Sequence, residues 1–190
     1  MSVPQVFTDA NVLYSSALRD ILIELALDGI IALRWSPAVL DELIRALVRT
    51  RPDYSTAKGL RLAAAMTGAL MDVLVIPPDA TAPKLTLPDP NDVHVLATAC
   101  HAECTMILTF NLKHFPADQL AFAGRPIEAV HPDAFLLTLL TSDAPAVLAV
   151  VERVRQKLTK PPMTVAAYAD SLARSGLPGM AELLRCLLPA

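Results

Sequence analysis

The chain contains 190 residues, of which 54% are apolar and 18% are charged, and its formal net charge is −3. This length suits one α/β domain with a small appendage, and the high apolar content excludes an intrinsically disordered chain. The net charge does not by itself indicate a nucleic-acid-binding protein. No run approaches the ~18 uninterrupted apolar residues of a membrane-spanning helix, and the amino-terminal segment does not resemble a signal peptide. We therefore expect a soluble cytoplasmic protein that does not associate with membranes.

Strand and helix patterns alternate along the first two thirds of the chain. Short β-rich runs predict strands, and apolar residues spaced three or four apart predict amphipathic helices. In chain order, we expect a strand at 3–8, a helix at 18–28, an extended segment at 30–35, helices at 37–47 and 55–71, a strand at 73–76, a helix from 90 to about 101 and a strand at 106–109. Ser36-Pro37 and Asp89-Pro90 each supply a cap and a first-turn proline. This alternation predicts a parallel sheet covered by helices on both faces.

The pattern becomes wholly helical after about residue 132. Breaks in the helical pattern are expected near Ser142, at Pro161-Pro162 and between Gly176 and Gly179. We therefore divide the chain into an α/β domain at residues 1–132 and a helical carboxy-terminal extension at residues 133–190.

The three cysteines are Cys100, Cys104 and Cys186. Cys100 and Cys104 lie one turn apart on the apolar side of an expected helix. Because no second Cys/His pair has zinc spacing, buried thiols are favoured over metal ligands. This cysteine usage fits a reducing cytoplasm.

Two segments are locally basic within this acidic chain. Residues 42–65 contain five cations and two anions, and residues 152–160 contain four cations and one anion. Either segment could hold a phosphate backbone, although charged helix faces are more often simply solvated.

Polar side chains follow the expected strands at the edge of the sheet where ligands collect in parallel α/β folds. Asp9 follows the first strand, Asp89 and Asp92 begin the helix after the proline-rich loop, and Thr109 and Asn111 follow the last strand. Ordinary structural roles would also explain most of them, since Asp9 and Asn111 could form turns and Asp89 could cap a helix.

Asp92 and Glu42 are harder to assign to such roles. Asp92 is in line with Leu96 and Ala99, so its carboxylate points toward the packed side of its helix, where a charge requires a partner. Glu42 could be a solvated residue that pairs with Arg45 or Arg49. Several carboxylates that converge in a partly dry site need a cation among them. Oxygen ligands of this kind select Mg²⁺ or Mn²⁺.

Four segments in this order resemble the PIN-domain nucleases, and the likeness is closest to VapC-like toxins of bacterial toxin–antitoxin systems. They are V-F-T-D-A-N-V-L-Y (6–14), S-P-A-V-L-D-E-L-I-R (36–45), L-P-D-P-N-D-V-H-V-L-A-T-A (87–99) and I-L-T-F-N-L-K-H-F-P (107–116). The resemblance covers residues 3–132, and the helical tail resembles one found in a subgroup. It implies a three-layer α/β/α domain and Mg²⁺- or Mn²⁺-dependent hydrolysis of RNA.

The resemblance also implies roles for individual residues. The catalytic set is Asp9, Glu42, Asp92 and Asn111, the metal set is Asp9, Asp92, Glu42 and the auxiliary Asp89, and the substrate-binding set is Arg45, Arg49, Asn11 and Thr109. Asn11 is expected to hold the first acid or a bound water. A toxin of this kind is expected to pair with a small antitoxin protein and to form a homodimer.

His114 departs from the family pattern, which usually carries an acid three residues after the position of Asn111. A neutral imidazole could still bind Mn²⁺, but the change also permits a weak or inactive PIN-fold binding module. A phosphatase of the haloacid dehalogenase type is less favoured, because that family needs an aspartate where this chain has Asn11.

Overall fold

The computed structural model describes residues 3–77, 86–121, 126–159 and 161–187. At the centre of this part of the chain is a parallel sheet with the strand order β2-β1-β3-β4, made of β1 (Gln5–Thr8), β2 (Ala32–Arg34), β3 (Met106–Leu108) and β4 (Glu128–Val130). Val6 is aligned with both Leu33 and Met106, and Met106 is aligned with Glu128. The carboxyl ends of all these strands therefore meet at one edge.

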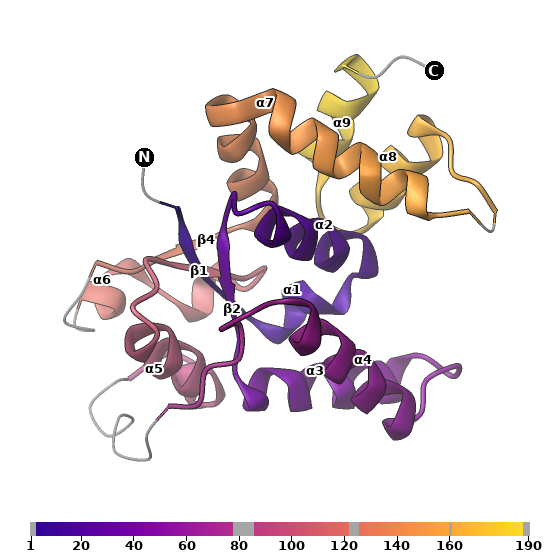
Figure 1. Cartoon of the computed structure of the whole chain (residues 1–190). Helices are drawn as coiled ribbons and strands as arrows, with labels where there is room; N and C mark the ends of the chain where they lie inside the picture. Colours follow the sequence, from indigo (N-terminus) through magenta and orange to yellow (C-terminus); the bar gives the residue numbers. More distant parts are fainter. Residues whose placement is uncertain (1–2, 78–85, 122–125, 160, 188–190) are drawn as a thin grey trace.

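Helices surround the sheet on both sides. They are α1 (Ala10–Tyr14), α2 (Ser16–Leu27), α3 (Pro37–Thr50), α4 (Thr56–Ala69), α5 (Val93–His101), α6 (Ala117–Leu120), α7 (Pro132–Lys157), α8 (Val165–Arg174) and α9 (Pro178–Leu187), with short 3-10 turns at η1 (Pro90–Asp92) and η2 (Leu112–His114). Helix α5 packs on β1 and β3, and α2 packs on β2. Figure 1 shows the sheet between α5 and α2, with α7, α8 and α9 gathered beyond α2. This arrangement confirms the α/β class with additional carboxy-terminal helices.

Local sequence explains how several helices begin. The Ser36 hydroxyl accepts a hydrogen bond from the Val39 amide at 3.2 Å, and the Ser55 hydroxyl accepts one from the Lys58 amide at 3.3 Å. The Asp89 carboxylate accepts one from the Asn91 amide at 2.9 Å, immediately before η1. These bonds satisfy donors that a helix start leaves without partners, so the predicted caps are confirmed.

Three features differ from the sequence prediction. The expected strand at 73–76 is reduced to a single bridge between Leu74 and Trp35, because prolines follow directly and cannot donate to a ladder. Helix α1 lies where a loop was expected, and β4 was missed because a three-residue edge strand carries little pattern of its own. The break expected near Ser142 is a kink inside α7, at Asp143 with φ −154° and two residues before Pro145.

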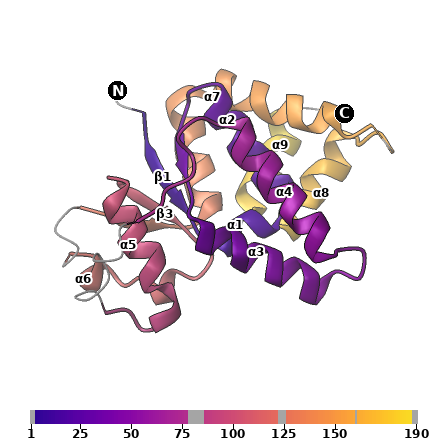
Figure 2. The same ribbon diagram turned by 60° about the horizontal axis from the view of Figure 1, so that its bottom comes forward.

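Helix α7 is long and apolar enough to cross a membrane, by length and composition alone. The sequence prediction did not find it, because polar residues interrupt its apolar run. In this fold the helix packs against α2 and α9 and buries Phe135, Leu136 and Val150 in the core. Figure 2 shows α7 beside α9 and α2 in a second orientation. Within the protein, α7 therefore serves as a packing helix for the carboxy-terminal extension.

Candidate active site

A cleft of about 550 Å³ opens at the edge of the sheet where β1 and β3 end. Its polar wall comes from distant parts of the chain and consists of Asp9, Asn11, Tyr14, Glu42, Arg45, Arg49, Thr50, Asp92 and Asn111. Parallel strands deliver the loops that follow them to a common edge, which explains why residues so far apart in sequence meet here. The cleft therefore contains both carboxylates and arginines, and α3 contributes Glu42, Arg45 and Arg49 together.

Asp9 is the most constrained of these acids. Its side chain is only 6% exposed, and its Oδ2 accepts hydrogen bonds from Asn11 Nδ2 at 2.6 Å and Thr109 Oγ1 at 2.7 Å. Asn11 Oδ1 in turn accepts a bond from the Phe110 amide at 3.2 Å. Although Asp9 occupies the cap position of α1, its side chain makes no capping bond. The carboxylate is therefore held by the side chains of Asn11 in α1 and Thr109 after β3, and it does not cap the helix.

The charge on Asp9 is unfavourable in this environment. Burial raises the pKa of the Asp9 carboxyl above its ordinary value, and the nearby Asp92 carboxylate raises it further. The hydrogen bond from Thr109 acts in the opposite direction but is smaller than the effect of burial. A cation placed between Asp9 and Asp92 would relieve both the desolvation and the repulsion.

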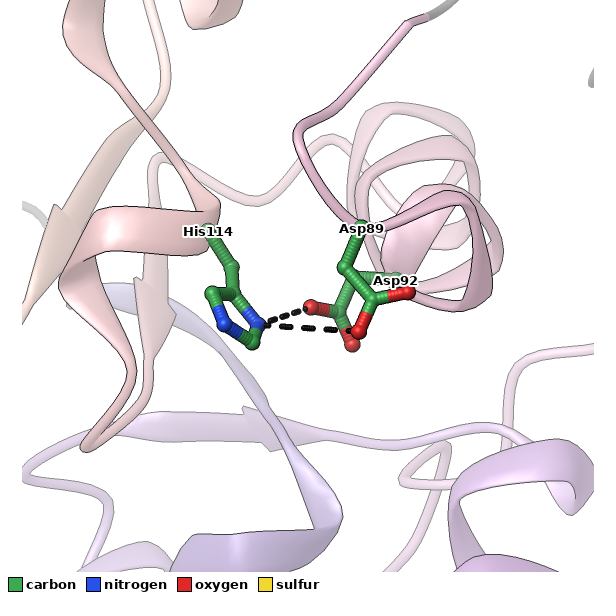
Figure 3. A group of neighbouring side chains, drawn as sticks. All are labelled: Asp89, Asp92 and His114. Atoms are coloured by element: carbon green, nitrogen blue, oxygen red, sulfur yellow. Dashed lines mark hydrogen bonds and ion pairs between the residues drawn. The ribbon is translucent and has the colours of Figure 1, made fainter.

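Asp92 has a partner that the sequence did not specify. His114 Nδ1 lies 2.7 Å from Asp92 Oδ2 and 4.0 Å from Asp89 Oδ2. Figure 3 shows the imidazole of His114 facing both carboxylates across the gap between η2 and the start of α5. One ligand atom from each of the three residues lies within 4.8 Å of the others, so the group could hold a metal ion. Two carboxylates with one imidazole suit Mn²⁺, and carboxylates with water suit Mg²⁺.

Glu42 pairs with a histidine rather than with an arginine. Its Oε1 lies 2.8 Å from His94 Nε2, and both side chains are partly buried. Arg45 instead donates from Nε to the backbone carbonyl of Asp41, and neither it nor Arg49 forms an ion pair within the described ranges. The alternative in which Glu42 is neutralised by these arginines is therefore wrong. The partner of Glu42 therefore comes from α5, a distant segment of the chain, and not from its own helix α3.

Comparison with protein families gives two matches along the chain. A model described as the PIN domain matches residues 5–113, which contain every acid of the cleft, and a model described as the VapC50 C-terminal domain matches residues 132–186. This chain belongs to the PIN domain family.

One curated relative of this PIN-domain protein is the "Putative ribonuclease VapC50" of Mycobacterium tuberculosis, strain ATCC 25618 / H37Rv. The two are 38% identical over 99 residues, which cover 52% of this chain and 57% of the relative. The match thus spans little more than half of the relative's length. No solved structure matches the chain.

The PIN domain brings most of the predicted site residues together. Asp9, Asn11, Glu42, Arg45, Arg49, Asp92 and Asn111 all line the cleft. Asp89 and Asp92 both face the imidazole of His114. Asp89 Oδ1 also accepts a hydrogen bond from Asn91 Nδ2 at 3.0 Å. Thr109 is fully buried, so it donates a hydrogen bond to Asp9 and is not among the residues that line the cleft. Asn111 is exposed and its side chain makes no capping bond to η2.

The two basic segments have different surroundings. Arg45 and Arg49 of the first segment face the cleft. In the second segment, Arg153 pairs with Glu24 and Asp28, Lys157 pairs with Glu24, and Arg155 pairs with Glu152. Lys160 lies outside the described residues. Arg153 and Lys157 therefore attach α7 to α2, and the acids that neutralise this segment leave it less suited than Arg45 and Arg49 to a phosphate backbone.

The cysteines are distant from this chemistry. Cys104 is buried, and burial raises the pKa of its thiol to about 12. Cys100 is half-buried and Cys186 is exposed. Of the predicted pair of buried thiols, only Cys104 is fully enclosed, and the one metal-capable cluster of the described residues contains no cysteine.

Sequence reasoning missed His94 and Tyr14. His94 stands inside the quoted segment 87–99, two residues after Asp92, and this proximity was the only available signal. Tyr14 ends α1, lines the cleft and joins its hydroxyl to the Thr50 hydroxyl at 2.7 Å. No local pattern distinguishes Tyr14 from a core aromatic residue.

Proposed function

We propose that this PIN-domain protein is a Mg²⁺- or Mn²⁺-dependent ribonuclease that hydrolyses RNA phosphodiester bonds. The observation that carries the proposal is the shared cleft of Asp9, Glu42 and Asp92, in which burial and a second carboxylate disfavour the charge on Asp9. Asp92 also belongs to the compact group with Asp89 and His114 that could hold a metal ion, and a divalent cation there would allow an acidic site to act on a polyanion. The name of the curated relative supports the same activity.

The residues suit the steps of such a reaction. Asp9, Asp92 and Glu42 would hold the ion, with Asp89 and His114 at its side. When bound, the ion would activate water, orient a phosphate oxygen and stabilise charge on the leaving oxygen. Asn11 and Thr109 keep the Asp9 oxygens in place. A carboxylate of the cluster accepts the proton of the attacking water, and Arg45 and Arg49 bind the flanking phosphates.

The proposed reaction is a simple hydrolysis. The oxygen of the attacking water forms a bond to phosphorus, and the bond from phosphorus to one ribose oxygen breaks. The water gives one proton to the carboxylate, and that proton then passes through solvent to the leaving oxygen, which restores the carboxylate. We assign Asn111 to a contact with the phosphate, and its exposed position in the lining of the cleft supports this role.

A catalytically weak binding module is the second candidate, and one specific observation favours it. His114 already contacts Asp92 at 2.7 Å, so one proposed metal ligand is engaged. A phosphatase of the haloacid dehalogenase type has less support, because Asn11 donates its amide to Asp9 at 2.6 Å and offers no general acid.

Cleavage of mixed RNAs in the presence of Mg²⁺ or Mn²⁺ tests the proposal. The wild-type protein is expected to cleave RNA, and both Asp9→Asn and Asp92→Asn are expected to lose this activity. Asp41→Asn is a matched control, since Asp41 is exposed beside Glu42 and does not line the cleft. Cleavage that survives both site substitutions would show that the activity lies elsewhere. Metal binding without any cleavage would favour the binding module.

We further propose that the protein is the toxin of a type II toxin–antitoxin pair in the cytoplasm, paired with a small antitoxin and not attached to a membrane. Support comes from the relative's name and from the match to the VapC50 C-terminal domain. Expression of the chain is expected to stop growth, and the product of a neighbouring short reading frame is expected to restore it. The proposed homodimer is tested by sedimentation of the purified protein.

A further inference from the structure

A second pocket of about 370 Å³ adjoins the cleft. Asn11 and Tyr14 line both spaces, so the pocket continues directly from the carboxylates across Tyr14. Its remaining wall includes Arg51 from the end of α3 and Arg174 from the end of α8. The pocket is therefore built jointly by the PIN domain and the carboxy-terminal helices.

A tight contact fixes the carboxy-terminal wall to the site. Gly176, in the turn after α8, has φ +84°, and a Cβ there would lie 2.7 Å from Phe110 Cε1. Phe110 stands between Thr109 and Asn111, and its amide donates to Asn11 at 3.2 Å. The turn that carries Arg174 is thus held against the same loop that supports Asp9.

The pocket has an excess of positive charge. Arg51 pairs with Asp53 at 3.1 Å, but Lys58 pairs with the same carboxylate at 3.2 Å, so two cations share one anion. Arg174 is exposed and forms no ion pair with any residue that the structure describes. Among the described residues that line the pocket there is no carboxylate, in contrast to the cleft. Helix α2 begins at its edge, and the partial positive charge of a helix amino end adds to that of the arginines.

We infer that this pocket binds the phosphate backbone of single-stranded RNA beside the bond to be cleaved, with Arg174 as the contribution of the carboxy-terminal helices. The inference rests on the proposed ribonuclease function. A strand that leaves the carboxylates crosses the ring of Tyr14, whose hydroxyl is anchored at Thr50, and then meets Arg51 and Arg174. Aromatic rings next to cationic grooves are the usual components of single-strand binding sites.

The test measures binding of a labelled single-stranded RNA of roughly ten nucleotides to metal-free protein over a range of salt concentrations. Each phosphate contact contributes about 0.7 to the slope of log affinity against log salt for a single strand. Arg174→Ala is expected to weaken binding several-fold and to reduce this slope by about that amount. Arg174→Lys keeps the charge and should retain most of the slope.

Arg185→Ala is the matched control. Arg185 lies on α9 of the same extension, outside both pockets, and its ion pair with Asp170 is exposed. It should bind RNA as the wild type does. If Arg174→Ala binds RNA with the affinity and slope of the wild type, the inference is overturned but the proposed function is not. The pocket would then be a candidate site for a protein partner. Absence of RNA binding by the metal-free wild-type protein would also overturn the inference, whereas the proposed function falls only if the wild type fails to cleave RNA with Mg²⁺ or Mn²⁺.

Discussion

His114 Nδ1 lies 2.7 Å from Asp92 Oδ2, so the residue that replaces the usual family acid is joined directly to a proposed metal ligand. A divalent ion at Asp92 must therefore share this carboxylate with the imidazole or move the imidazole aside. We therefore expect His114 to affect how strongly the proposed site holds a hard cation.

Replacing His114 with aspartate should strengthen Mg²⁺ binding. His114→Asp adds a hard oxygen donor, which Mg²⁺ prefers to nitrogen. We expect the Mg²⁺ concentration for half-maximal cleavage to fall by about tenfold or more, in line with changes made next to metal ligands. A higher Mg²⁺ requirement in His114→Asp would contradict this and would indicate that the imidazole itself is the better ligand.

The pair of Glu42 and His94 predicts a loss of turnover without a loss of folding. His94→Ala removes the partner 2.8 Å from the Glu42 carboxylate and leaves that acid free to rotate. The turnover number should fall by roughly 10- to 100-fold, whereas His94→Gln, which can still donate a hydrogen bond, should keep part of the activity. His101→Ala, at the exposed end of the same helix, is the control. Equal turnover in His94→Ala and wild type would rule out an orienting role.

The raised pKa of Asp9 makes the metal-free protein sensitive to pH. A carboxyl whose pKa is higher in the folded state binds its proton more tightly there. Tighter proton binding by Asp9 therefore stabilises the folded state fully below a pH of about 4, near the pKa of the unfolded chain. This stabilisation is lost as the pH rises through the pKa of the folded state.

Asp9→Asn removes the free-energy cost of burying a charged carboxylate at neutral pH. At pH 7 without metal, the variant should melt at a higher temperature than the wild type, by a few degrees if the gain is about 1 kcal/mol. The difference should shrink toward pH 4, and Mn²⁺ should raise the melting temperature of the wild type only. Thermal melts at several pH values provide the measurement. A variant that is less stable at pH 7 would contradict the assignment of strain to the Asp9 charge.

Gly176 is expected to couple the carboxy-terminal helices to the site. Gly176→Ala places a side chain at φ +84° and against the Phe110 ring, and it should destabilise the protein by about 1–3 kcal/mol. Cleavage should decrease as well, because Phe110 carries the amide bonded to Asn11. Gly68→Ala in the exposed part of α4 meets nothing within 4 Å and should be neutral or stabilising by about 0.5–1 kcal/mol. Urea unfolding of the two variants compares their stabilities directly. Equal stability would exclude the close contact between Gly176 and Phe110.

The sequence predicted those features that depend on neighbouring residues. Ser36 and Asp89 were identified as caps because capping involves residues two or three apart, and both form the expected bonds. The partner of Glu42 could not be found in this way. His94 is 52 residues distant along the chain, and only the tertiary fold brings the two side chains together. The sequence offered Arg45 or Arg49 as a possible partner, because both are close to Glu42 along the helix, but Arg45 donates to the Asp41 carbonyl instead.

The same distinction applies to the charged segments and the pocket. Arg153 and Lys157 were expected on a solvated or phosphate-binding surface, whereas they bind Glu24 on a helix more than a hundred residues away. Arg174 carried no signal in the sequence, because its place beside Tyr14 depends on the turn at Gly176.

Titration with Mn²⁺ tests most directly whether the carboxylates form a metal site. Electron paramagnetic resonance reports the free ion in solutions of the wild type, Asp9→Asn, Asp92→Asn and the control Asp41→Asn. We expect the wild type and Asp41→Asn to bind Mn²⁺ equally and the other two variants to bind at least about tenfold more weakly. Equal affinity in all four proteins, or no binding by the wild type, would contradict the account.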